Sequence, residues 1–264
     1  MNQEIYERAN QILKSVYGPD ASFRQGQYEA IEATLTNKRT IVVQKTGWGK
    51  SLVYFISAKM VSGITIIISP LLVLMDNQRI LAEQLGLSCA ILNSYVVKDD
   101  RTKMLDGIRR GDYDVIFTTP ETLYSVDFQP LIPNLNIGLF VIDECHCISD
   151  WGHDFRLNYG KLNRIIAAFP ESVSVLGTTA TANDRVLADL KKQFGDNVYI
   201  SKGPLTREGL HIEILKLETK AERYAWLKDN LNKIPGSGII YCITKNDCLN
   251  LSDFLNRNGI SARP

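Results

Sequence analysis

The segment QKTGWGKS at residues 44–51 contains residue types that could bind a phosphate group. It follows an apolar run and precedes a helical pattern. A glycine-rich turn in that position directs backbone N–H groups and the positive end of a helix at an anion. Lys50 would reach the β- and γ-phosphates of a nucleotide, and the Ser51 hydroxyl would ligate Mg²⁺. The alternative is a glycine-rich turn that arose by chance.

The phosphate-loop pattern is incomplete at one position. The full pattern has glycine where this chain has Gln44. Trp48 is bulky for such a loop, although it falls at a variable position. The prediction therefore depends on the residues that do match, which are Thr46, Gly47, Gly49, Lys50 and Ser51.

The second reactive segment is VIDECHCISDWGHDFR at residues 141–156. Asp143 and Glu144 end an apolar run. One carboxylate could hold hydrated Mg²⁺, and the next could activate an attacking water. Carboxylates that cap a helix are the alternative, but the GKS sequence upstream favours a nucleotide hydrolase.

A cluster of aromatic and basic residues follows these two acids. Trp151 and Phe155 offer ring faces on which nucleic-acid bases could stack, worth about 1–3 kcal/mol per base. Arg156 offers a planar contact to phosphate. The alternative for the two rings is packing in the core, and His153 in GHD could belong to a turn.

Elements that could position these residues alternate along the chain. Short runs rich in Val and Ile predict strands, and they lie at residues 40–44, 64–69, 88–92, 114–119, 138–143 and 172–178. Several are apolar at consecutive positions, which is typical of parallel strands covered on both faces. Helical patterns lie between them, and residues 51–60 place Leu52, Phe55, Ile56 and Met60 on one stripe. We therefore predict an α/β fold with a mostly parallel sheet flanked by helices.

Two domains are expected. Residues 1–205 would form the first, with a linker at about 201–209. Residues 206–264 would begin a second α/β unit, with apolar segments at 211–217 and 238–244 and a charged helix between them. About sixty residues are too few to close a second sheet of similar size.

Composition limits the function classes. The chain has 264 residues, 45% of them hydrophobic, and a formal net charge of +1. A nucleic-acid surface must therefore be local. The five cysteines do not form a disulfide pattern, and Cys145 and Cys147 lack a second ligand pair at zinc spacing. No signal peptide and no membrane-spanning run is recognised, so we expect a soluble cytoplasmic protein.

Several motifs together resemble one known family. The sequence from Asp143 to His146 resembles a variant DEAH box of superfamily 2 helicases, and CISDWGHDFR closely resembles the aromatic-rich loop of RecQ-family DNA helicases. Other segments resemble further motifs of that family in the same order. They are FRQGQYEAI (motif 0), TGWGKS (I), SPLLVLMDNQ (Ia), TTPETL (Ib), TTATAN (III) and GIIYCITKNDC (the start of IV).

This resemblance implies a RecA-like fold and an ATP-dependent DNA helicase that moves 3′ to 5′, with ATP and Mg²⁺ as cofactors and roles in DNA repair and recombination. It implies that the loop containing Trp151, His153, Phe155 and Arg156 senses single-stranded DNA. His146 would couple that loop to the ATP site.

The resemblance also assigns roles to the other motifs. Arg24 and Gln27 would contact adenine, and Tyr17 is only a weak match to the expected stacking aromatic. The DNA-contacting or coupling residues would be Ser69, Pro70, Thr119, Pro120, Thr179 and Thr181. The two threonines at 179 and 181 could also cap the following helix.

The chain departs from the family near its end. It stops at Pro264 soon after motif IV, so no residue can be assigned as the arginine that completes the γ-phosphate site, and the zinc-binding, winged-helix and HRDC regions are not found. We expect a fragment with little unwinding activity alone. The alternatives are a DEAD/DEAH RNA helicase and a non-catalytic nucleotide- or DNA-binding module.

Overall fold

A computed structural model describes residues 2–36, 39–149, 159, 161–195, 197–204 and 211–264. Contacts divide the chain into two compact units, Met1–Arg207 and Glu208–Pro264. Within the described residues, no helix is both long and apolar enough to cross a membrane.

The first unit is built on a seven-stranded sheet with the order β3-β4-β2-β5-β6-β1-β7. Every pair of neighbouring strands is parallel. The strands are β1 (Arg39–Val43), β2 (Ile64–Ile68), β3 (Cys89–Leu92), β4 (Val115–Thr118), β5 (Ile137–Asp143), β6 (Ser174–Thr179) and β7 (Tyr199–Lys202). The α/β fold with a parallel sheet is thus confirmed, and each of the six expected strands lies within two residues of its predicted bounds. The edge strand β7 was not predicted.

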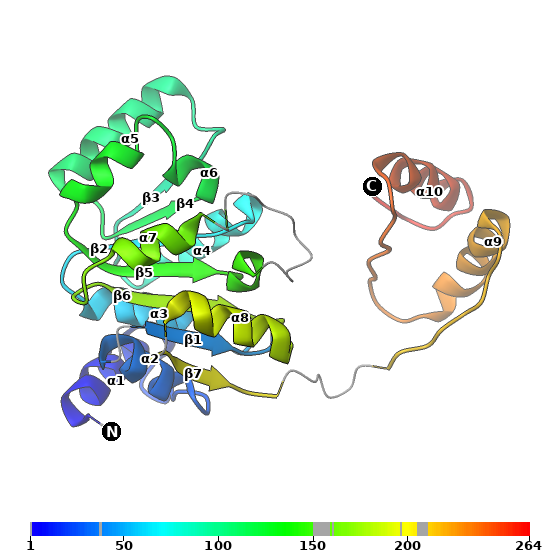
Figure 1. Ribbon diagram of the computed structural model, residues 1–264. Helices are drawn as coiled ribbons and strands as arrows, with labels where there is room; N and C mark the ends of the chain where they lie inside the picture. The colour runs from blue at the N-terminus through cyan, green and yellow to red at the C-terminus, as the bar shows by residue number, and fades with distance from the viewer. Residues whose placement is uncertain (1, 37–38, 150–158, 160, 196, 205–210) are drawn as a thin grey trace. The chain divides into compact units, whose positions relative to one another are not determined.

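Helices cover both faces of this sheet (Figure 1). Helices α1 to α4 contribute to one apolar core cluster, and helices α5 to α8 contribute to the other. Their bounds are α1 (Gln3–Tyr17), α2 (Gln27–Thr36), α3 (Lys50–Met60), α4 (Leu72–Gln84), α5 (Lys98–Arg110), α6 (Pro120–Leu123), α7 (Leu162–Ala168) and α8 (Asp184–Phe194), with 3-10 turns η1 (Gln129–Asn134) and η2 (Cys145–Ile148). Both faces of the central strands are therefore buried, which explains their continuous apolar sequences.

Helix α3 is more deeply buried than its sequence pattern indicates. Leu52 and Met60 of the predicted stripe are only half-buried, whereas Tyr54 and Ser57 are fully buried. The helix packs against α1 and α2 as well as β5, so it is covered on more than one side. This packing fixes the helix that begins at the phosphate loop.

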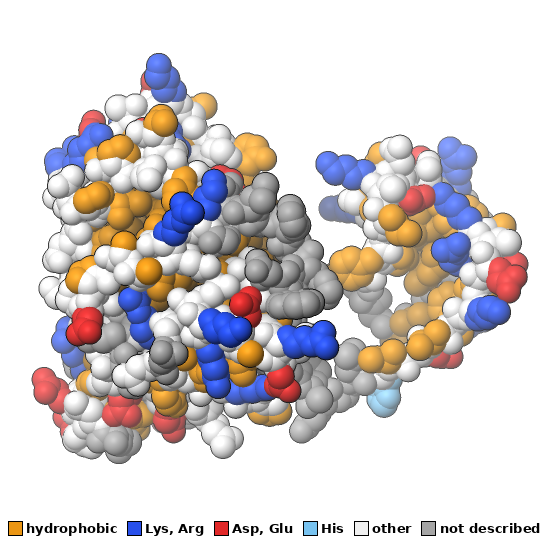
Figure 2. All heavy atoms as spheres, in the orientation of Figure 1, with side chains coloured by type: hydrophobic (Ala, Val, Ile, Leu, Met, Phe, Trp, Pro, Cys, Tyr) orange, Lys and Arg blue, Asp and Glu red, His pale blue; other side chains and the backbone are white. Residues whose placement is uncertain are grey.

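The second unit contains α9 (Lys220–Asn230), η3 (Leu231–Lys233) and α10 (Lys245–Arg257). The apolar segments at 211–217 and 238–244, which were expected to begin a second α/β unit, form no strand among its described residues. A strand is stabilised by hydrogen-bonded neighbours, and these segments have none in the sheet. Their side chains are largely exposed, as at Ile214 (91%) and Ile243 (97%), and Figure 2 shows apolar side chains on the surface of this unit.

Candidate active site

The phosphate loop joins the carboxyl end of β1 to α3. Gly47 (φ 82°) and Gly49 (φ 101°) both adopt left-handed conformations that favour glycine. Lys50, the first residue of α3, donates from Nζ to the carbonyl of Gln44 at 2.8 Å, and Ser51 lies half-buried in the same helical turn. Burial lowers the pKa of Lys50, while the charges of Glu144 and Asp143 act in the opposite direction.

Gln44 occupies the position where the full loop pattern has glycine. Its side chain is buried, and a Cβ atom placed on Gly203 would lie 2.2 Å from its Oε1. Gly203 also donates its N–H to the carbonyl of Val43 at 3.1 Å. The glutamine therefore fits because a glycine beyond β7 leaves room for its side chain.

Residues just before and at the start of α2 form hydrogen bonds with the phosphate loop. Gln27 donates from Nε2 to the carbonyls of Trp48 (3.0 Å) and Gly49 (3.4 Å), while its Oε1 accepts from the Arg24 N–H at 2.8 Å. Arg24 also donates from Nη1 to the carbonyl of Gly47. Trp48 is buried and donates from Nε1 to the Gln25 carbonyl at 3.2 Å. Arg24 and Gln27 are thus in contact with the phosphate loop, and their recognition of adenine stays a prediction.

Asp143 ends β5 with its carboxylate almost enclosed. Its Oδ1 accepts from the Thr178 hydroxyl (2.6 Å) and from the Glu144 N–H (3.1 Å), and its Oδ2 accepts from Gln78 Nε2 (3.0 Å). Burial raises the pKa of Asp143, and the hydrogen bonds from Thr178 and Gln78 oppose that shift.

Glu144 has a left-handed backbone with φ 52°, the only positive φ recorded for a non-glycine residue in the described chain. This conformation is costly for a residue with a Cβ and turns the chain sharply out of the sheet. Its carboxylate lies 3.3 Å from His146 Nδ1. Burial alone would raise the pKa of Glu144, but the hydrogen bond and charge of His146, together with the charge of Lys50, hold it below its ordinary value. Glu144 is therefore kept ionised.

His146 connects the end of β5 to the end of β6. Its Nδ1 lies 2.9 Å from Thr179 Oγ1 and 3.5 Å from Thr181 Oγ1. A carboxylate can only accept, so the contact with Glu144 requires a proton on Nδ1. The hydrogen bonds with Cys147, at 3.6 Å from Nε2, and with Glu144 raise the pKa of His146. One imidazole thus joins Glu144 to the end of β6 and the residues that follow it.

The sequence matches a family model described as DEAD/DEAH box helicase over residues 24–190. That range includes the phosphate loop, the acid pair, Thr179 and Thr181. The chain belongs to the DEAD/DEAH box helicase family. The resemblance noted in the sequence is thereby confirmed at the level of the family.

Curated relatives of this helicase-family chain are described as DNA helicases, several of them RecQ, and in one case as an RNA helicase. It is 36% identical to a putative ATP-dependent DNA helicase Q1 of Caenorhabditis briggsae over 97% of its own length and 43% of that protein. It is 34% identical to ATP-dependent DNA helicase RecQ of Bacillus subtilis (strain 168), over 98% of its length and 44% of that protein. A putative ATP-dependent RNA helicase, R290, of Acanthamoeba polyphaga mimivirus is 36% identical over 95% of the chain and 45% of that protein. The chain therefore spans less than half the length of these relatives.

Solved structures support the fold alone. A variant of S. cerevisiae Dbp5, solved with RNA and ADP BeF3, superimposes with a TM-score of 0.73 at 17% identity, over 94% of this chain and 65% of that one. This likeness confirms that the helicase-family sheet is of the RecA-like type.

The other helicase motifs lie at the carboxyl ends of neighbouring strands. Ser69 follows β2, is buried, and accepts from the Leu71 N–H through Oγ at 3.4 Å, and Pro70 beside it is also buried. Thr119 caps α6 by accepting from the Thr122 N–H at 3.3 Å, and Pro120 is the first residue of that helix. Contacts of these four residues with a nucleic acid stay a prediction. Trp151, His153, Phe155 and Arg156 lie outside the described residues.

Two residues that contact Asp143 were not predicted from the sequence. Thr178 and Gln78 lie 35 and 65 residues away along the chain. Gln78 is the last residue of the segment resembling motif Ia, and Thr178 begins the one resembling motif III. These positions were the available signals, but sequence spacing alone does not show that they meet one carboxylate.

The oxygen atoms of this candidate site suit a hard cation. Asp143 and the Ser51 hydroxyl supply oxygen, and three of about four acceptor positions on Asp143 are filled, so one is free on Oδ2. Among the described residues, no group of three or more His, Cys, Asp or Glu residues could hold a metal. Mg²⁺ usually binds through one or two protein oxygens, waters and substrate phosphates, so this donor set fits it.

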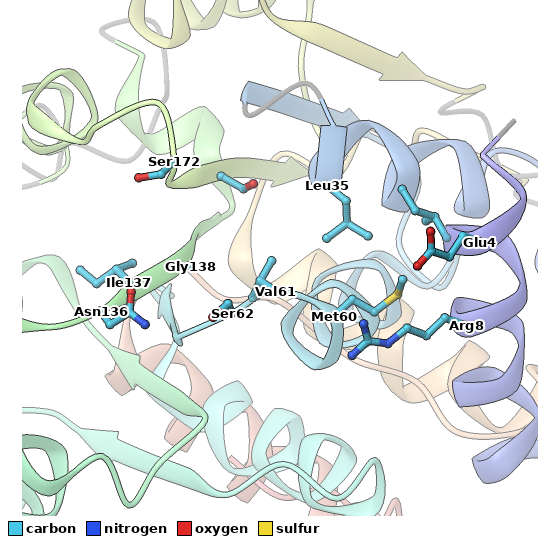
Figure 3. A pocket seen from close by; sticks show the side chains of 12 residues that line it. Glu4, Arg8, Leu35, Met60, Val61, Ser62, Asn136, Ile137, Gly138 and Ser172 are labelled. Carbon is cyan, nitrogen blue, oxygen red and sulfur yellow. The ribbon is translucent and has the colours of Figure 1, made fainter.

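A separate cavity of about 520 Å³ lies away from this site (Figure 3). It is bounded by α1, the end of α3 and the amino ends of β5 and β6, and it includes Arg8, Met60 and Asn136. The phosphate loop and the acid pair lie at the carboxyl ends of the strands. In parallel sheets ligands bind at that opposite edge, so this cavity is not part of the candidate active site.

Proposed function

We propose that this chain is the nucleotide-binding part of a RecQ-type DNA helicase, which couples ATP hydrolysis to 3′-to-5′ movement on single-stranded DNA and to duplex unwinding. The observation that carries the proposal is the chain of contacts from Glu144 through His146 to Thr179. It joins a candidate hydrolytic carboxylate to the segment that resembles motif III. The RecQ relatives favour DNA as the polynucleotide.

In this proposal, Lys50 binds the β- and γ-phosphates, and Ser51 and Asp143 hold Mg²⁺, which would neutralise charge on the phosphates. Glu144 orients and deprotonates the attacking water, because its lowered pKa keeps it ionised. The Lys50 ammonium must exchange its bond to the Gln44 carbonyl for phosphate oxygens.

Adenine contacts by Arg24 and Gln27 belong to the same proposal. The Gln27 amide already bonds to the phosphate loop, so an adenine edge would compete with or share those bonds. Loop position and base recognition would then be coupled through one side chain.

Single-stranded DNA would contact the first unit through Ser69, Pro70, Thr119 and Pro120. The loop at 149–156 would report bound DNA to the ATP site through His146. We further propose that the unit Glu208–Pro264 is the beginning of a second RecA-like lobe. We also propose that the protein takes part in DNA repair or recombination and that it is located in the cytoplasm.

RNA is the competing polynucleotide, since one relative is described as a putative RNA helicase. The deciding experiment measures ATP hydrolysis by a longer protein with a complete second lobe, with matched single-stranded DNA and RNA. Greater stimulation by DNA is expected. Greater stimulation by RNA would assign the RNA alternative, and absence of hydrolysis with both would indicate a non-catalytic binding module.

A further inference from the structure

Gln78 links helix α4 to the acid pair. Its Nε2 donates to Asp143 Oδ2 at 3.0 Å. The glutamine lies midway along α4, Leu72–Gln84, which begins one residue beyond the Ser69–Pro70 segment. No role follows from its motif, and Asp143 is the carboxylate proposed to hold Mg²⁺.

The orientation of the Gln78 amide is fixed by chemistry. An ionised carboxylate only accepts hydrogen bonds, so the NH₂ group must face Asp143 and Oε1 must face elsewhere. This Oε1 is buried and has no hydrogen-bond partner in the described structure. A buried amide oxygen without a donor is costly and requires an explanation.

The free acceptor position of Asp143 lies on the oxygen that Gln78 contacts. Oδ1 receives two hydrogen bonds, from Thr178 and from the Glu144 N–H, whereas Oδ2 receives one, from Gln78. A ligand of Oδ2 would therefore approach beside the Gln78 amide. Mg²⁺ in such sites keeps several waters, and these waters only donate hydrogen bonds to the protein.

We propose that Gln78 is a positioning residue for the Mg²⁺ of the nucleotide site. Its N–H group holds Asp143 Oδ2 in place, and its Oε1 accepts a hydrogen bond from a water of the hydrated metal. This inference rests on the proposed function, because it assumes that Asp143 binds Mg²⁺ together with ATP. It adds a residue from α4 to a site otherwise built from α3, β5 and β6.

The test uses the chain of residues 1–264 and a fluorescent, non-hydrolysable ATP analogue. Mg²⁺ is titrated at fixed analogue concentration, and analogue binding is also measured in EDTA. Gln78→Met removes both amide contacts with little change in size, and Gln78→Asn withdraws the amide by one methylene. Both variants should weaken the apparent Mg²⁺ affinity by about 10–100-fold, as losses of outer-shell partners do. Binding in EDTA should change less than about twofold.

Gln84→Met is the matched control. Gln84 is exposed at the end of the same helix, so this variant should retain the wild-type Mg²⁺ dependence. Mn²⁺ binding followed by electron paramagnetic resonance provides a second readout that does not depend on activity. Thermal melting reports whether each variant is folded, and Gln78→Asn serves if Gln78→Met does not fold.

The outcomes separate this inference from the proposed function. If the wild-type chain shows no Mg²⁺-dependent nucleotide binding, the proposed function itself fails. If the wild type shows it and the folded Gln78 variants match the wild type, only the role of Gln78 is overturned. Equal weakening with Mg²⁺ and in EDTA would also overturn it, because a general structural defect has that effect.

Discussion

The Nδ1 atom of His146 lies 2.9 Å from the Oγ1 atom of Thr179, although the two residues are 33 positions apart in the sequence. Thr179 Oγ1 also accepts from the Thr181 N–H at 3.1 Å and donates to the Thr181 carbonyl at 3.2 Å. Its hydroxyl proton is thus used within the turn, and the imidazole must be the donor in the first contact. The position of this turn and the position of His146 are consequently linked.

Replacement of Thr179 tests that link. Thr179→Val keeps the volume but removes the acceptor, and we expect DNA-stimulated ATP hydrolysis by a two-lobed protein to fall by about tenfold, the equivalent of one hydrogen bond. Thr179→Ser keeps the hydroxyl and should retain most stimulation. Equal rates for the valine and serine variants would show that the contact does not affect hydrolysis.

Lys50→Ala should weaken binding of Mg-ATP by roughly 10–150-fold, since a charge-assisted contact contributes about 1.5–3 kcal/mol. Calorimetric titration of the chain measures this affinity. Lys59→Ala is the matched control, because Lys59 lies at the other end of α3 and donates to the Gly86 carbonyl. Unchanged affinity in the Lys50 variant would exclude a phosphate-binding role for this loop.

Glu144→Gln should leave ATP binding in place while hydrolysis by a two-lobed protein falls about 10²–10⁴-fold, because the amide cannot accept the proton of water. Quench-flow or steady-state phosphate release measures the rate. A variant that hydrolyses ATP near the wild-type rate would show that another residue activates the water.

The pair of Glu144 and His146 gives a pH dependence of stability. The pKa of Glu144 is lower in the folded chain than its unfolded value near 4.5. Ionised Glu144 therefore stabilises the fold at pH values above about 4.5, and this contribution is lost as pH falls through the folded pKa. The raised pKa of His146 contributes fully below its unfolded value near 6.5 and is lost as pH rises toward the folded pKa. The two contributions therefore overlap at about pH 5–6.

In that interval wild type should exceed His146→Gln in stability by about 1 kcal/mol, or roughly 2–4 °C in Tm, with a smaller difference at pH 8. Melting at several pH values measures this difference. NMR titration of the imidazoles is a direct check, since the chain has only three histidines. A His146 that titrates below its ordinary pKa would contradict the interaction with Glu144.

Trp151→Ala distinguishes DNA sensing from core packing. In a two-lobed protein, the sensing role predicts loss of stimulation by single-stranded DNA with nearly intact basal hydrolysis, because Lys50, Asp143 and Glu144 remain. Core packing predicts instead a loss of about 3–5 kcal/mol in stability, with basal and stimulated rates falling together. ATPase assays with and without DNA, together with the Tm, discriminate between the two. Early melting with unchanged fold stimulation would reject the sensor.

The sequence predicts the sheet better than it predicts the contacts of the site. The five inner strands are recognisable because burial on both faces requires consecutive apolar residues, and the edge strand β3 is also apolar throughout. The edge strand β7 is half-buried and mixes polar with apolar side chains, so it gives a weaker signal. Trp48 illustrates why the contacts of the site are harder to predict. Its position in the loop is variable in the pattern, and its burial against Gln25 depends on a segment more than twenty residues upstream.

The place of β1 in the strand order has a consequence for biosynthesis. In the described sheet, β1 pairs with β6 and β7, whose residues are made about 135 to 160 positions after it. While the ribosome synthesises the intervening chain, β1 has no partner, and its exposed backbone and apolar side chains favour association with other chains. Strand β1, which precedes the phosphate loop, therefore cannot pair with both neighbouring strands until Lys202 has emerged from the ribosome. An N-terminal piece that ends before β6 would be prone to aggregate and could not retain the nucleotide site.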